Sequence, residues 1–134
     1  MKVVLDTNVL VSAILSNGPP SVIVDLMANG KLIPFYNDPI IEEYWNVLHR
    51  PKFNFLDKQI DLLLDTIVKT GVAIDISVSN AIKMTHEDDS KFYYTAKAAK
   101  AFLITGNIKH YPKESFIVTP SEFLRTHNGG VRKV

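Results

Sequence analysis

Three acidic residues, far apart in the chain, each lie beside the end of a predicted strand or helix. Asp6 follows the apolar run 2–5, Glu43 lies in the first turns of a predicted helix, and Asp89 stands at the start of another. The amide residue Asn107 follows a later apolar run. If these side chains converge, the carboxylates cannot all stay ionised without a cation. The set therefore predicts a Mg²⁺ or Mn²⁺ site and phosphodiester chemistry.

Repulsion within such a cluster is large enough to require a counter-ion. Two carboxylates about 5 Å apart repel by about 3 kcal/mol at an effective dielectric constant of about 20. Three such pairs cost on the order of 10 kcal/mol, which is comparable to the stability of a whole domain. The chain has no cysteine, so a metal ion must be held by oxygen or histidine ligands.

Each of these residues also has a purely structural explanation. Asp6 alone would serve as a turn residue or helix cap, Glu43 as a solvated helix residue, and Asp89 as the cap of its helix. Asn107 belongs to a type of residue that is common in turns. The metal hypothesis therefore depends on the joint placement of these side chains and not on any one of them.

Strands and helices alternate along the chain, as expected for an α/β protein. The predicted strands cover residues 2–5, 32–36, 72–76, 101–104 and 116–118. The predicted helices cover residues 8–15, 21–28, Pro39 to Leu48 after a cap at Asn37 or Asp38, 57–69, 90 to about 100, and 120–124. This order implies right-handed crossovers. We expect a three-layer α/β/α sandwich around a mostly parallel sheet of four to five strands.

In an open parallel sheet, ligands bind outside the carboxyl ends of the strands. Asp6 follows the first strand, and Thr105 and Asn107 follow the fourth, so these residues belong on that rim. Glu43 lies on a helix that begins just past the second strand. Asp89 lies at a helix start, where free N–H groups favour a carboxylate.

Length and composition indicate one globular domain. The chain has 134 residues, of which 46% are apolar and 22% are charged. We expect a single domain over residues 1–125 and a flexible tail over residues 126–134. The net charge of +1 argues against a high-affinity nucleic-acid scaffold but allows an enzyme with a local basic rim. No apolar run is long enough to span a membrane and no signal peptide is visible, so we expect a cytoplasmic protein.

Four segments together resemble a known family. They are Val3–Val9 (VVLDTNV), Glu42–Phe53 (EEYWNVLHRPKF), Glu87–Phe92 (EDDSKF) and Leu103–His110 (LITGNIKH). In this order and at these intervals, over essentially its full length, the chain resembles the PIN (PilT N-terminus) domain ribonucleases. It looks closest to the VapC-like branch, the toxins of toxin–antitoxin pairs. The resemblance implies a PIN-type sandwich and Mg²⁺- or Mn²⁺-dependent cleavage of RNA.

The resemblance also assigns roles to residues. The family's first three acidic positions fall on Asp6, on Glu43 with Glu42 as its alternative, and on Asp89 with Asp88 as its alternative. The fourth position, usually aspartate, carries Asn107, which would complete the ligand shell through its oxygen. A further acid found in many relatives is replaced by His110. Both departures should weaken metal binding.

The remaining residues of the predicted site are supporting or substrate-binding. Thr7, Asn8 and Thr105 would steady the carboxylates by hydrogen bonds, and Asp88 is a further supporting residue. The candidates for contacting phosphate are Arg50, Lys52, Lys109, His110 and Lys113, for which ordinary surface charge is the alternative explanation. Expected partners are RNA, an antitoxin protein and a second copy in a homodimer. The apolar stripe over residues 60–68 would serve either a dimer or the protein's own core.

Three other functions compete with this interpretation. Haloacid dehalogenase-like phosphatases also begin with a strand ending in aspartate, but they need a second aspartate where this chain has Asn8. A receiver-like domain needs a lysine after a late strand, which Lys109 matches only loosely. The third alternative is a degenerate PIN domain that binds RNA or a protein partner without cleavage, which Asn107 and His110 favour.

Overall fold

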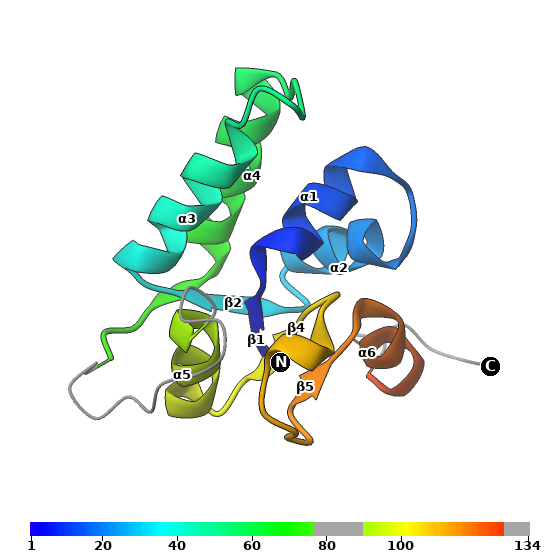
Figure 1. The fold of residues 1–134 in the computed structure, drawn as a ribbon, viewed down its shortest axis with the longest axis vertical. Helices are drawn as coiled ribbons and strands as arrows, with labels where there is room; N and C mark the ends of the chain where they lie inside the picture. Colours follow the sequence, from blue (N-terminus) through cyan, green and yellow to red (C-terminus); the bar gives the residue numbers. More distant parts are fainter. Residues whose placement is uncertain (77–89, 128–134) are drawn as a thin grey trace.

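A five-stranded parallel sheet lies at the centre of the molecule (Figure 1). The computed structural model describes residues 1–76 and 90–127. The strands are β1 (Lys2–Leu5), β2 (Ile33–Tyr36), β3 (Val72–Ala73), β4 (Phe102–Ile104) and β5 (Ile117–Val118). The helices are α1 (Thr7–Leu15), α2 (Pro19–Ala28), α3 (Asp38–Leu48), α4 (Asp57–Thr70), α5 (Ser90–Ala99), α6 (Pro120–Thr126) and the short 3₁₀ helix η2 (Ile108–His110). The predicted α/β fold class is confirmed.

The strand order places a topological switch at the centre of the sheet. The order is β3-β2-β1-β4-β5, and every pairing is parallel. The chain first moves outward from β1 through β2 to β3, and then returns to the other side of β1 to form β4 and β5. Ligands of open α/β sheets bind at the carboxyl ends of the strands beside such a switch. The residues that follow β1 and β4 therefore face the place where a site is expected.

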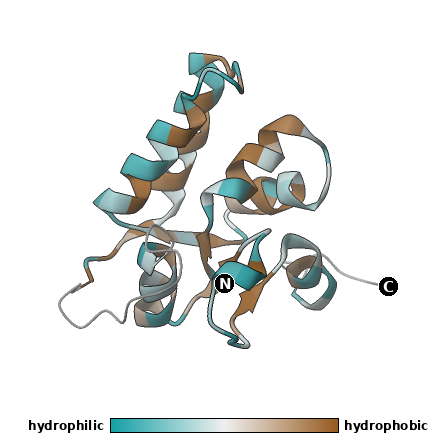
Figure 2. Ribbon diagram, viewed as in Figure 1, coloured by the Kyte–Doolittle hydropathy of each residue, from teal (hydrophilic) through white to brown (hydrophobic). Residues whose placement is uncertain are grey.

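Helices cover both faces of the sheet. In Figure 1, α1 to α4 lie on one side of the strands and α5 lies on the other, where it packs against β1, β2 and β4. Hydrophobic residues gather in the strands and on the inward sides of the helices (Figure 2). Val3, Val4 and Leu5 of β1 are buried, as expected for a parallel strand with helices on both faces.

Local sequence explains where the helices that carry the site begin. The Asn37 side chain accepts a hydrogen bond from the Ile40 backbone N–H at 3.2 Å and caps α3, with Pro39 in its first turn. Of the two predicted caps, Asn37 is thus the one used. Asp6 caps α1, which begins one residue earlier than predicted. The predicted cap Asp89 of α5 lies outside the described residues.

Several boundaries differ from those predicted. Strand β3 is paired only over Val72–Ala73 and not to residue 76, because it is a short edge strand with exposed side chains. Pro34 fits within β2, where it pairs with Val3. In the apolar stripe of α4, Ile60, Leu63 and Ile67 are buried in the protein's own core. The predicted domain end at residue 125 stays a prediction, since residues 128–134 are not described.

The test for membrane-spanning helices gives a limited result. Within residues 1–76 and 90–127, no single helix is both long enough and apolar enough to cross a membrane. Helices α1 and α2 reach the required length and apolar composition only as a pair, and that pair is bent by 103°.

Gly71, between α4 and β3, should not tolerate a side chain. A Cβ atom there would lie 2.3 Å from the Pro34 carbonyl oxygen and 2.6 Å from that of Ile67. We expect Gly71→Ala to lower the free energy of unfolding by about 1 to 3 kcal/mol, measured by urea denaturation. Gly18→Ala is the control, because its Cβ would meet nothing closer than 3.8 Å. Equal stability of the two variants would contradict the predicted steric conflict.

Candidate active site

Asp6 is a buried carboxylate at the end of the central strand. Its side chain is only 5% exposed. Asp6 Oδ2 accepts hydrogen bonds from the Thr105 hydroxyl and the Tyr111 hydroxyl, each at 2.8 Å. Asp6 Oδ1 accepts a long bond of 3.5 Å from the Asn8 backbone N–H at the start of α1. These donors come from three segments of the chain, so the position and orientation of the carboxylate are fixed by the fold.

Glu43 reaches the same region from α3. Its Oε2 accepts a hydrogen bond from the Thr7 hydroxyl at 2.5 Å. Its Oε1 forms an ion pair with Lys91 Nζ on α5 at 2.8 Å. The Glu43 and Lys91 side chains are 21% and 23% exposed, so the pair is partly shielded from water. Both carboxylate oxygens of Glu43 are therefore engaged, and one of them already faces a positive charge.

The side chain of Tyr44, the next residue on α3, is affected by the negative charges of both carboxylates. It is fully buried, and its hydroxyl donates a hydrogen bond of 2.6 Å to the Leu5 carbonyl oxygen. Burial raises the pKa of the Tyr44 hydroxyl well above its usual value, and the charges of Asp6 and Glu43 raise it further. Tyr44 stays protonated and ties α3 to the end of β1, which holds the helix where Glu43 lines the same cleft as Asp6.

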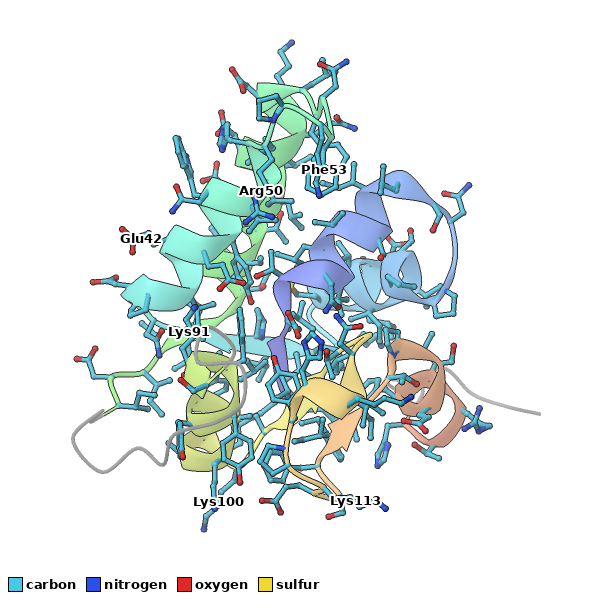
Figure 3. All side chains as sticks on the ribbon, in the orientation of Figure 1. Glu42, Arg50, Phe53, Lys91, Lys100 and Lys113 are labelled. Atoms are coloured by element: carbon cyan, nitrogen blue, oxygen red, sulfur yellow. The ribbon has the colours of Figure 1, made fainter. Side chains whose placement is uncertain are left out.

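Asp6 and Glu43 line one open cleft of about 640 Å³. Residues of α1, α3, the loop after α3 and the start of α5 form its walls. Figure 3 shows Glu42, Arg50, Phe53 and Lys91 on the elements that surround this cleft. The lining residues are Asp6, Thr7, Asn8, Val11, Ser12, Pro39, Glu42, Glu43, Asn46, Val47, Arg50, Phe53 and Lys91.

The structure brings some of the other predicted site residues to this point. Thr105 is buried and bonded to Asp6, and Asn8 Oδ1 accepts the Gly106 backbone N–H at 3.0 Å. Asn107 is exposed, does not line the cleft, and donates its backbone N–H to the Thr105 hydroxyl at 2.9 Å. Asn107 therefore positions Thr105 through its backbone. The predicted ligand Asp89 and its alternative Asp88 lie outside the described residues.

The predicted basic residues divide into two groups. Arg50 lines the cleft. Lys52 lies outside the lining, with its ammonium 5.1 Å from the centre of the Phe53 ring. The predicted residues Lys109, His110 and Lys113 do not line the cleft either.

Sequence reasoning missed two residues that contact the carboxylates. Tyr111 follows η2 and is 7% exposed. The signal available in the sequence was a tyrosine directly after a short polar segment. Lys91 lies within the quoted segment Glu87–Phe92 but was assigned no role. Its contact with Glu43 depends on how α3 and α5 pack, which sequence spacing does not show.

The donor chemistry of the cleft fits a hard divalent cation. Asp6 and Glu43 supply carboxylate oxygens, the ligand type that Mg²⁺ and Mn²⁺ prefer. A cationic group, Lys91 Nζ, already lies 2.8 Å from Glu43 Oε1, which shows that this position favours positive charge. Within residues 1–76 and 90–127, no three acidic or histidine side chains are grouped closely enough to hold a metal ion. A divalent cation held by Asp6 and Glu43 would need further ligands.

Comparison with known proteins identifies the family. The sequence profile of the PIN domain matches residues 2–109. The chain belongs to the PIN domain family. PIN domains are generally nucleases, so this places the chain in a family of nuclease-type hydrolases.

One relative and the search of solved structures complete the comparison. The chain is 32% identical over 110 residues to a protein of Methanocaldococcus jannaschii named Uncharacterized protein MJ1680. The alignment covers 80% of this chain and 71% of that protein, whose name assigns no activity. No solved structure shows a significant match to this PIN domain.

Tyr111→Phe should destabilise the protein, because it removes one hydroxyl donor from the buried Asp6 carboxylate. We expect a loss of about 1.5 to 3 kcal/mol in the free energy of unfolding, the usual range for a hydrogen bond to a charged group. Tyr36→Phe is the matched control, since the Tyr36 hydroxyl makes a long, exposed bond of 3.4 Å to the Val68 carbonyl oxygen. A loss in Tyr111→Phe no larger than in the control would contradict this role.

Lys91→Met should lower stability without metal and increase the response to metal. Glu43 loses its positive partner, so we expect a loss of about 1 kcal/mol, between the values for exposed and buried ion pairs. Millimolar Mn²⁺ should then raise the melting temperature more than in the wild type, because no ammonium competes for Glu43. Lys97→Met is the control on the same helix, since the Lys97 ammonium lies over Tyr93 and not over Glu43. Equal Mn²⁺ shifts in wild type and Lys91→Met would contradict the competition.

Proposed function

We propose that this PIN domain is a metal-dependent endoribonuclease that hydrolyses RNA phosphodiester bonds. The observation that carries the proposal is the convergence of Asp6 and Glu43, which lie on different elements and line one cleft beside the topological switch of the sheet. Each carboxylate is held by hydrogen bonds from neighbouring segments. Membership of a family of nucleases supports the same conclusion.

The residues of the chain would act in distinct ways. Asp6 and Glu43 would hold Mg²⁺ or Mn²⁺, with Asp89 as the third acid that the sequence predicts. The cation, when bound, would neutralise charge on the phosphate and lower the pKa of a water molecule. Thr105 and Tyr111 fix the orientation of Asp6 through their hydroxyl groups, and Thr7 does the same for Glu43.

Cleavage of labelled single-stranded RNA in Mg²⁺ or Mn²⁺ tests this proposal. Asp6→Asn and Glu43→Gln keep the shape of each side chain and remove its charge, so we expect each to reduce the cleavage rate by about a hundredfold or more. Asp57→Asn is the control, because this exposed acid of α4 lies outside the cleft lining and pairs with His49 at 3.7 Å. Cleavage that persists in EDTA or in Asp6→Asn would show that the assignment is wrong.

One observation favours a second candidate function. The ion pair with Glu43 places the positive charge of Lys91 where a metal ion is expected. A PIN domain with such an internal cation would bind RNA or a protein partner without cutting. Undegraded RNA that nevertheless binds with a measurable affinity in Mn²⁺ would support this alternative over the nuclease.

The cellular role remains a proposal based on sequence resemblance. The segments around Asp6 and Glu43 resemble those of VapC-like toxins, which supports a role as the toxin of a toxin–antitoxin pair in the cytoplasm. An antitoxin would then cover the cleft, and the PIN domain would act as a homodimer. Growth arrest on expression, relieved when a neighbouring gene is co-expressed, would test the antitoxin partner. The molecular mass in solution would test the homodimer.

A further inference from the structure

We propose that Arg50 and Phe53 form a nucleotide subsite at the far end of the cleft, which holds one unpaired nucleotide of a single-stranded RNA beside the carboxylates. The inference rests on the proposed function, because it takes RNA as the ligand of the cleft. It goes further by naming the residues that bind the strand and the groups of the nucleotide that each one recognises.

The cleft extends along one face of α3. Glu43 and Asn46 lie three residues apart on the same side of α3, and Arg50 lines the cleft just beyond the helix end, after the C-cap residue His49. Five residues of helix separate Glu43 from Leu48, the last residue of α3, which corresponds to about 7.5 Å along the axis, and Arg50 lies two residues further on. This length is comparable to that of a dinucleotide. A strand whose phosphate lies at Asp6 and Glu43 would therefore bring its neighbouring nucleotide to Arg50.

Arg50 has the chemistry to bind the phosphate of that nucleotide. It is exposed, lines the cleft, and has no ion-pair or side-chain hydrogen-bond partner within the part of the chain that the structure describes. The other cation in the cleft lining, Lys91, is paired with Glu43. A guanidinium group offers parallel N–H donors that match two phosphate oxygens. The cleft thus has an acidic end at Asp6 and an arginine at its other end.

Phe53 supplies a flat apolar surface next to Arg50 (Figure 3). Its half-buried ring lines the cleft and stacks on Phe55, with ring centres 5.1 Å apart and planes only 6° from parallel. Asn54, between them, adopts the left-handed conformation with φ of 52°, and this reversal brings the two rings together. The Phe53 backbone N–H also donates to the Arg50 carbonyl oxygen at 3.1 Å. The loop therefore fixes Phe53 before any ligand binds.

The geometry selects an unpaired base. An aromatic side chain stacks on the face of a base, and that face is accessible only when the base has left a duplex. The Lys52 ammonium lies 5.1 Å from the centre of the Phe53 ring, on an exposed and flexible side chain. An incoming base would take its place against the ring, and the ammonium would move toward the phosphate backbone.

Binding of fluorescein-labelled single-stranded RNA, measured by anisotropy in EDTA, tests the role of Phe53. Phe53→Leu keeps an apolar side chain but removes the ring, and we expect it to weaken binding about fivefold or more. Phe53→Trp should retain the affinity. In a Trp45→Phe background this new tryptophan is the only one in the chain, so its fluorescence should be quenched by the RNA. Unchanged affinity in Phe53→Leu would overturn the subsite.

Arg50 is tested in the same assay against lysines elsewhere. Arg50→Gln should weaken binding about fivefold or more and reduce the salt dependence by about 0.7 in log–log slope, as expected for one lost phosphate contact to a single strand. Lys97→Gln and Lys100→Gln each remove one positive charge outside the cleft lining and should change affinity less than about twofold. If these controls weaken binding as much as Arg50→Gln does, binding is non-specific and the subsite is wrong.

Two further ligands separate the possible sources of the nucleotide. A free nucleoside monophosphate should compete poorly, because it lacks the neighbouring nucleotides of a strand, and an RNA duplex should bind without any dependence on Phe53. Equal dependence on Phe53 for duplex and single strand would overturn base stacking. Binding is measured in EDTA and does not depend on cleavage, so RNA that stays uncut in Mg²⁺ or Mn²⁺ overturns the nuclease and leaves the subsite standing. Cleavage in Mg²⁺ or Mn²⁺ together with unchanged binding by Phe53→Leu supports the nuclease and overturns the subsite.

Discussion

A buried carboxylate at the end of the central strand constrains the rest of this structure. Removing a charged group from water is costly unless donors surround it. Asp6 meets this requirement with two hydroxyl groups and a backbone N–H. The hydroxyl groups belong to the segment that follows β4, and the N–H belongs to the first turn of α1. The segments that follow β1 and β4 must therefore close on the same point, and the cleft opens where they meet.

The second wall of the cleft depends on two contacts that hold α3 in place. The Tyr44 hydroxyl joins the helix to the last carbonyl of β1, and the buried Asn37 side chain donates to Thr95 on α5 at 2.8 Å. These bonds fix both the height and the rotation of α3 relative to the sheet. Glu43 consequently lines the same cleft as Asp6, while Trp45 of the same helix is 51% exposed. One helix thus presents a catalytic candidate and an apolar surface in different directions.

Much of the fold follows from local patterns in the sequence. The continuous apolar run at Val3 to Leu5 predicts a strand buried on both faces, and Asn37 with Pro39 predicts the start of α3. The extent of β3 was not predictable, because an apolar stretch continues to Ile76 whereas pairing depends on a neighbouring backbone. The meeting of Asp6 with Glu43 was predicted from strand ends and family resemblance. The contacts of Tyr111 and Lys91 were not, since they arise from packing between segments distant in sequence.

The order in which the chain is synthesised gives the Asp6 contacts a biological consequence. Asp6 leaves the ribosome well before its two hydroxyl donors, which lie 99 and 105 residues further along the chain. Contacts of such long sequence separation form late, because a large loop must close first. A growing chain that has reached only α5 still lacks both groups that orient the carboxylate. A partly synthesised polypeptide therefore cannot present the finished site, and translation itself delays the moment at which the cleft becomes competent.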